Sequence, residues 1–192
     1  MKVPYYNLGK HAGNPHKRSV LMNNLYVKAI LYSYPHLDEL ADQITELMAR
    51  KAVASMYDFS PCERQCYKMV ELALQKGVVT ELKKVSDAVL KNFSEEDVAC
   101  LDKKYFKTGN KNSCDIKQGK EFFRQIYKIE KKIGFLLECE GVCDEWFKDN
   151  CMEIAFFREL VKTVKEREEI LKKGKDTFER KKRSERPRSV SA

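Results

Sequence analysis

The chain has 192 residues, of which 43% are hydrophobic and 34% charged, and its formal net charge is +8. A chain of this length and composition buries a core of one domain or two small ones, which excludes disorder over its whole length. The positive charge favours an anionic partner, such as nucleic acid, an acidic protein surface or phospholipid headgroups, and does not choose among them. Only 8 Gly and 5 Pro interrupt stretches rich in Leu, Lys, Glu and Ala. This pattern predicts an all-α, multi-helix bundle of about six to seven helices.

Cysteine usage and hydropathy predict where the protein works. Seven cysteines occur in a chain that has no N-terminal apolar run typical of a signal peptide. We therefore expect a reducing, cytoplasmic location. No stretch reaches the roughly 18 consecutive apolar residues of a membrane span, so we expect no membrane partner.

The first half of the chain predicts a flexible arm and then four helices. Residues 1–18 contain several Gly and Pro and show no apolar period, which is typical of a flexible arm. Residues 19–92 form a helical N-terminal half, with a short helix over 19–34 and a longer one after Pro35. Pro61 at a first helical position, after the capping hydroxyl of Ser60, begins a third helix that we expect to end near Gly77. The fourth helix carries the apolar residues Val79, Leu82, Val85, Val89 and Leu90.

Residues 93–172 predict a second helical region. Ser94, followed by three acids, caps a fifth helix that ends near 105–106. Residues 108–113 are polar and rich in turn formers, and a long helix is expected over 115–139, closed by Gly141. Residues 144–147 suit one helical turn, and a last helix begins near Cys151 and leaves the core by about residue 172. The highly charged residues 173–192 are expected to form a disordered basic tail.

The helix expected over 115–139 carries the strongest functional signal. On a helical wheel its apolar side holds Phe122, Ile126, Ile129, Ile133 and Leu136, and the opposite sector is cationic. Such a helix docks on a core by one side and presents Lys and Arg to phosphates, while Gln and Arg side chains hydrogen-bond to base edges. A solvated stripe without a partner is the alternative. The predicted nucleic-acid-binding residues are Lys117, Gln118, Lys120, Arg124, Gln125, Lys128 and Lys131.

Two segments resemble a known DNA-binding unit. Residues 93–106 read FSEEDVACLDKKYF, and residues 120–133 read KEFFRQIYKIEKKI. They resemble the first helix and the recognition helix of the promoter-reading C-terminal domain of bacterial RNA polymerase sigma factors. The resemblance implies a helix-turn-helix that binds duplex DNA, with RNA polymerase or another protein as a further partner. That domain places a full support helix between the two, where this chain has only residues 107–114, so the expected unit is a reduced one.

A second resemblance covers residues 19–164. The segments YPHLD at 34–38, YF at 105–106, FFRQ at 122–125 and EWF at 145–147 are similar to an uncharacterised family of Firmicutes proteins. That family implies no known activity.

Other candidate sites favour structural roles. Cys62 and Cys66, and again Cys139 and Cys143, are four residues apart, which suits half of a zinc site, although buried free cysteine is the commoner arrangement. The histidines, His11, His16 and His36, lie near no candidate nucleophile. The glycines form no phosphate-binding loop. Trp146 is either a partner anchor or, as we favour, a plug in the core. We therefore expect no catalytic residue, no metal, no cofactor and no small-molecule substrate.

Two functional hypotheses follow from these patterns. The first is a non-enzymatic DNA-binding protein, a sigma-like transcription regulator, whose cationic helix approaches duplex DNA. The second is a helical adaptor whose basic face contacts an acidic protein.

Overall fold

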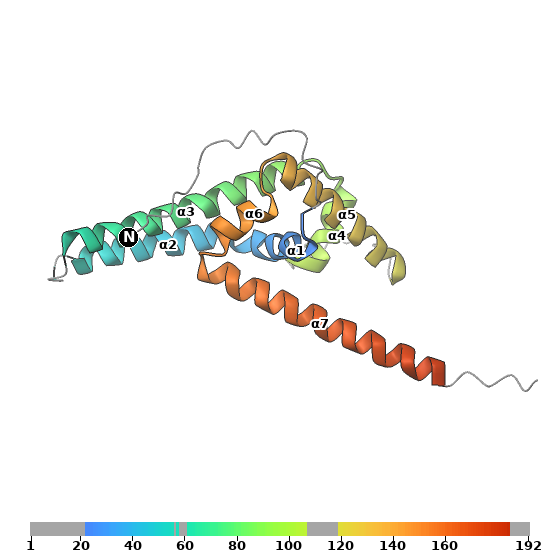
Figure 1. Ribbon diagram of the computed structural model, residues 1–192. Coiled ribbons are helices and arrows are strands. Elements are labelled where there is room, and N and C mark those ends of the chain that lie inside the picture. The colour runs from blue at the N-terminus through green and yellow to red at the C-terminus, as the bar shows by residue number, and fades with distance from the viewer. Residues whose placement is uncertain (1–21, 56, 58–60, 107–118, 185–192) are drawn as a thin grey trace, which may run out of the picture.

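The computed structural model describes residues 22–55, 57, 61–106 and 119–184 (Figure 1). These residues contain seven α-helices, α1 to α7, and three short 3-10 or π-helical segments, without a strand. The predicted all-α fold is therefore confirmed. None of the helices in the described ranges is long and apolar enough to cross a membrane. The predicted arm at 1–18 and turn at 108–113 lie outside the described residues.

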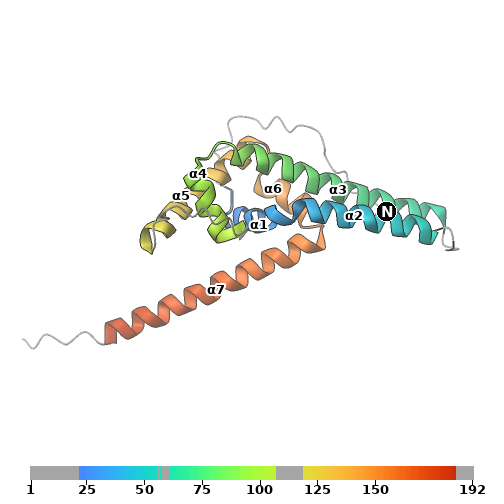
Figure 2. The same ribbon diagram turned by 180° about the vertical axis from the view of Figure 1, so that it is seen from behind.

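The N-terminal half is a short helix followed by a long helical hairpin. The side chain of Asn23 caps α1 (Asn24–Ser33) by accepting a hydrogen bond from the backbone nitrogen of Leu25 at 3.0 Å. A 3-10 turn, η1 (Tyr34–His36), then leads into α2 (Leu37–Ser55). Helix α3 (Cys62–Leu90) runs back along α2 (Figures 1 and 2).

The prediction that a helix ends at Gly77 is wrong, because α3 passes through this residue without a break. A capping glycine needs a left-handed backbone, and positive φ angles among the described glycines occur at Gly119 and Gly141 alone. Leu72 and Val78 are buried on either side of Gly77, so packing continues the helix. The predicted third and fourth helices are therefore one. Its predicted cap, Ser60, lies outside the described residues, and Pro61 takes the capping position without a side-chain hydrogen bond.

Two adjacent elements form the support for the following helix. Ser94 caps α4 (Glu95–Leu101) by accepting a hydrogen bond from the backbone nitrogen of Asp97 at 3.3 Å, as predicted. A π-helical segment, η2 (Asp102–Phe106), continues from α4. Helix α5 (Lys120–Cys139) begins after Gly119, whose φ of 80° is not helical. Residues 115–118 of the predicted helix lie outside the described residues. Its end at Cys139, followed by Gly141 with a φ of 90°, was predicted.

The C-terminal elements close the bundle and then leave it. Helix α6 (Asp144–Trp146) is the predicted single turn, and the π-helical η3 (Phe147–Cys151) follows it. Helix α7 (Ala155–Ser184) starts later than expected, because Cys151 belongs to η3. It also extends beyond residue 173. Residues 173–184 are therefore helical, whereas the sequence predicted a disordered tail from residue 173. This stretch is rich in Lys and Arg, which favour helix, and has no Pro before Pro187.

The core lies where α1 meets α5, η2 and α7 (Figure 1). The fully buried ring of Phe147 stacks on Tyr26 at 4.8 Å and meets Phe157 edge-on at 5.9 Å, measured between ring centroids. Trp146 is half-buried against this core, in agreement with the predicted plug. Val164 is the last buried residue of α7 among the described side chains, so the helix leaves the core before residue 172, as predicted.

Among the described residues, no third element packs on the far end of the α2–α3 hairpin. Beyond Ile44 in α2 and before Leu72 in α3, none of the described side chains is buried. Instead, this part of the hairpin exposes Val53, Tyr57, Tyr67 and Val70.

Candidate nucleic-acid interface

Helix α5 is fixed to the bundle by its apolar side. Ile126, Ile129 and Ile133 are buried, while Phe122 and Leu136 are half-buried and pack against the core. The predicted apolar side of this helix is therefore confirmed. Burial of three isoleucines contributes several kcal/mol, roughly 1.5–3 kcal/mol for each side chain, so the orientation of α5 is well determined.

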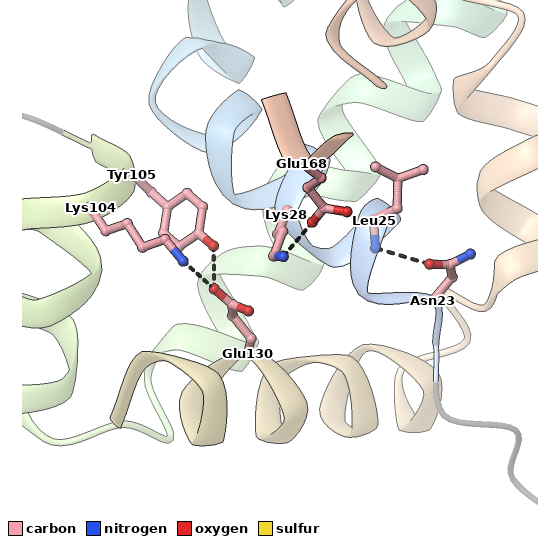
Figure 3. Close-up of polar contacts among 7 residues, drawn as sticks. All are labelled: Asn23, Leu25, Lys28, Lys104, Tyr105, Glu130 and Glu168. Atoms are coloured by element: carbon pink, nitrogen blue, oxygen red, sulfur yellow. Dashed lines mark hydrogen bonds and ion pairs between the residues drawn. The ribbon is translucent and has the colours of Figure 1, made fainter. Parts of the chain in front are cut away.

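A buried polar cluster adds a specific attachment to this side. The carboxylate of Glu130, only 3% exposed, accepts hydrogen bonds from the hydroxyl of Tyr105 and from Lys104 Nζ, the latter at 2.6 Å (Figure 3). Both partners belong to η2, and the Tyr105 ring meets Tyr32 of α1 edge-on at 4.6 Å. Burial, and then the charge of Glu130, raises the pKa of Tyr105 far above its usual range. The phenol therefore stays protonated and donates to the carboxylate.

Two further polar contacts hold α5 to its neighbours. Gln125 donates to Asp97 Oδ1 of α4 at 3.0 Å. Lys132 donates to the backbone oxygen of Asn92 at 3.3 Å, and its ammonium lies 4.5 Å from the ring centre of Phe93. Gln125, predicted to contact nucleic acid, is thus half-buried and bonded within the fold. Gln125 therefore lies at the contact with α4, whereas the predicted cations of α5 are exposed.

The predicted cations lie together on the outward side of α5. Lys120, Arg124, Lys128 and Lys131 are all exposed. None of them forms an ion pair with another residue in the described part of the chain. Lys117 and Gln118, the other two predicted site residues, lie outside the described residues.

Sequence reasoning missed three exposed aromatic rings on the same side. Phe123 is 64% exposed, Tyr127 51% and Phe135 48%. Lys131 Nζ lies 4.8 Å from the ring centre of Tyr127. The signal was present, because these rings follow one another at multiples of four residues, but the apolar pattern drew attention to the buried side alone. We call the following seven residues the α5 face: Lys120, Phe123, Arg124, Tyr127, Lys128, Lys131 and Phe135.

The α5 face consists of two parallel rows. Residues four apart on a helix lie about 6 Å apart along the axis and about 40° apart around it. One row is Lys120, Arg124 and Lys128, and the other is Phe123, Tyr127, Lys131 and Phe135. Together the rows cover an arc of about 140°. A row of cations thus runs beside a row that is mostly aromatic.

The face ends where the chain becomes acidic. Glu138, near the end of α5, is half-buried. Burial, followed by the charges of Asp144 and Glu145, raises its pKa. The exposed cations of the face therefore lie between Lys120 and Lys131, on the N-terminal side of this acidic region.

The other candidate sites are the cysteine pairs and the histidines, and only some of these residues lie in the described ranges. Cys62 Sγ and Cys66 Sγ lie 4.0 Å apart at the exposed start of α3, and Cys143 caps α6 by accepting from the Trp146 nitrogen at 3.5 Å. No group of three or more His, Cys, Asp or Glu residues within the described ranges is arranged to hold a metal ion. His36 is exposed, 3.9 Å from Glu39 Oε2, and His11 and His16 lie outside these ranges.

Comparison with known proteins adds no relative, because no family model, curated protein or solved structure matches the chain. The resemblances to sigma factors and to the Firmicutes family therefore stay predictions. Helix α4 packs against α5, as a helix-turn-helix requires, but the segment between η2 and α5 lies outside the described residues.

Proposed function

We propose that the protein is a non-enzymatic DNA-binding protein that uses the α5 face. One observation carries this proposal: a row of exposed cations that form no ion pair with the described residues. These cations lie on α5, whose opposite side is buried and holds the helix on the core. Cations that form no ion pair with the described residues can meet phosphates without first breaking such a pair. The resemblance to sigma factors makes regulation of transcription the process that we propose.

Replacing Lys120 and Arg124 with Ala tests the face directly. If each of the four cations of the α5 face contacts one phosphate, the logarithm of the binding constant falls with the logarithm of the salt concentration with a slope of about −3.6 on duplex DNA. Losing two of these contacts makes the slope shallower by about 1.8. We expect the Lys120→Ala, Arg124→Ala protein to show this change in a fluorescence anisotropy titration across a salt series. Its helicity should stay at the wild-type value, because both side chains are exposed.

The matched control removes the same charge elsewhere. Lys51 and Lys68 are exposed on the distal hairpin, so Lys51→Ala, Lys68→Ala changes the net charge equally. We expect this control to keep the wild-type slope. A second control ends the chain before Glu179 and removes the basic tail, which binds polyanions without specificity. If the Lys120→Ala, Arg124→Ala protein binds like the hairpin control, the α5 face is not the DNA site.

The rival function is an adaptor for an acidic protein helix, and the exposed rings beside the cations favour it. Such a partner would place its carboxylates on Lys120 and Arg124 and apolar side chains on Phe123 and Tyr127. A synthetic helix with Glu and Leu on one side is a suitable probe. Binding of this peptide, together with no DNA binding at low salt, would replace the DNA proposal with the adaptor.

A further inference from the structure

We propose that the α5 face prefers single-stranded over double-stranded DNA, with unpaired bases stacked on its rings. This inference rests on the proposed function and names the form of nucleic acid that the site takes. Phe123, Tyr127 and Phe135 are about half exposed or more, and they share one side of α5 with Lys120, Arg124 and Lys128.

The chemistry of the rings favours the faces of bases over their edges. A duplex presents the edges of its bases, which are recognised by hydrogen-bond donors and acceptors. The rings of Phe123 and Phe135 have neither, and Gln125 already donates to Asp97. The faces of bases, in contrast, are covered in a duplex and free in a single strand, and aromatic side chains stack on them regardless of sequence.

The spacing of the rows agrees with an extended strand. Phe123 and Tyr127 are one turn apart, about 6 Å along the axis, whereas stacked nucleotides in one strand of a duplex are about 3.4 Å apart. A strand that follows the row is therefore stretched, and each ring takes the place of a neighbouring base. The adjacent row of Lys120, Arg124 and Lys128 runs in the same direction and neutralises its phosphates.

Lys131 completes the arrangement. Its ammonium lies on one face of the Tyr127 ring, at 4.8 Å from the ring centre. Tyr127 is 51% exposed, which leaves room for a base on its ring, and the ammonium beside it pairs with the phosphate of that nucleotide.

The test compares a short oligo-dT with a duplex of equal length in anisotropy titrations at the same salt concentration. We expect the wild-type protein to bind oligo-dT at least about tenfold more tightly. The Phe123→Ala, Tyr127→Ala protein should lose about tenfold or more on oligo-dT and less than about twofold on the duplex. The matched control is Tyr57→Ala, Tyr67→Ala, which removes two exposed rings from the hairpin and should change neither affinity. Thermal melting followed by circular dichroism confirms that all variants fold.

A spectroscopic measurement detects stacking itself. Phe123→Trp places an indole on the α5 face, and Tyr67→Trp places one at an exposed position of the hairpin. We expect oligo-dT to quench the added fluorescence of Phe123→Trp and to leave that of Tyr67→Trp unchanged. Trp146 contributes an equal background to both proteins.

The outcomes separate this inference from the proposed function. Equal affinity for both forms of DNA, lost on removal of Lys120 and Arg124 but not of the rings, would overturn the single-strand preference and leave DNA binding in place. Binding of neither form at low salt would overturn both. Binding of the acidic synthetic helix alone, with dependence on Phe123 and Tyr127, would assign the face to a protein partner.

Discussion

Glu130 is the one acidic residue that is buried in the described part of the chain. A buried carboxylate is costly unless it accepts hydrogen bonds, and here Tyr105 and Lys104 both donate to its Oε1. The cluster joins α5 to η2, whereas the isoleucines beside it pack without directional contacts. It therefore fixes the rotation of α5, and with it the direction in which the α5 face points.

Removing this carboxylate should destabilise the fold. Glu130→Ala leaves the Tyr105 hydroxyl buried without an acceptor and opens a cavity, so we expect the free energy of unfolding to fall by about 3 kcal/mol. Urea denaturation measures this change. The control is Glu166→Ala, at an exposed position of α7, which should stay within about 0.5 kcal/mol of the wild type. Equal stability of the two variants would show that the cluster does not hold α5.

At the scale of elements, two glycines inside helices have different surroundings. A Cβ atom added at Gly77 of α3 would meet no atom within 4 Å, whereas one at Gly134 of α5 would lie 3.2 Å from Val27 Cγ2 of α1. Gly77 thus occupies an open surface, and Gly134 allows α1 and α5 to approach closely.

The same substitution should therefore act differently at the two positions. Gly77→Ala gains helix propensity without a steric penalty, and we expect the free energy of unfolding to rise by about 1 kcal/mol. Gly134→Ala has the same intrinsic gain but crowds Val27, so its stability should lie below that of Gly77→Ala. Urea denaturation of both proteins measures the difference. A Gly134→Ala protein at least as stable as Gly77→Ala would contradict the close crossing of α1 and α5.

The elements also show how far sequence reasoning reaches. Local patterns predicted the Ser94 cap, the end of α5 at Cys139 and the exposure of Lys120 and Arg124, because caps and helical periods depend on neighbouring residues. They failed at Gly77, where contacts with another helix continue α3. They could not pair Glu130 with Tyr105, which is 25 residues away in the chain. The burial of Gln125 likewise depends on where α4 packs.

On the scale of the whole molecule, helix α5 and the tip of the α2–α3 hairpin lie at opposite ends of the bundle (Figures 1 and 2). Helix α1 lies between them and contacts both α5 and α7. Nucleic acid bound to α5, as we propose, would therefore lie away from the described part of the hairpin. This separation is what makes substitutions on the hairpin suitable controls for those on α5.

The absence of buried side chains from the described part of the distal hairpin has a further consequence, for amide hydrogen exchange. Opening the ends of α2 and α3 exposes little apolar surface beyond Ile44 and Leu72, so it costs far less free energy than global unfolding. We expect exchange measured by mass spectrometry to be fastest near Ser55 and Cys62 and slowest near Val79 and Leu82, with a continuous gradient between them. Uniform protection along α3 would contradict this expectation. We thus expect the hairpin to open from its tip while the helices that carry α5 stay closed.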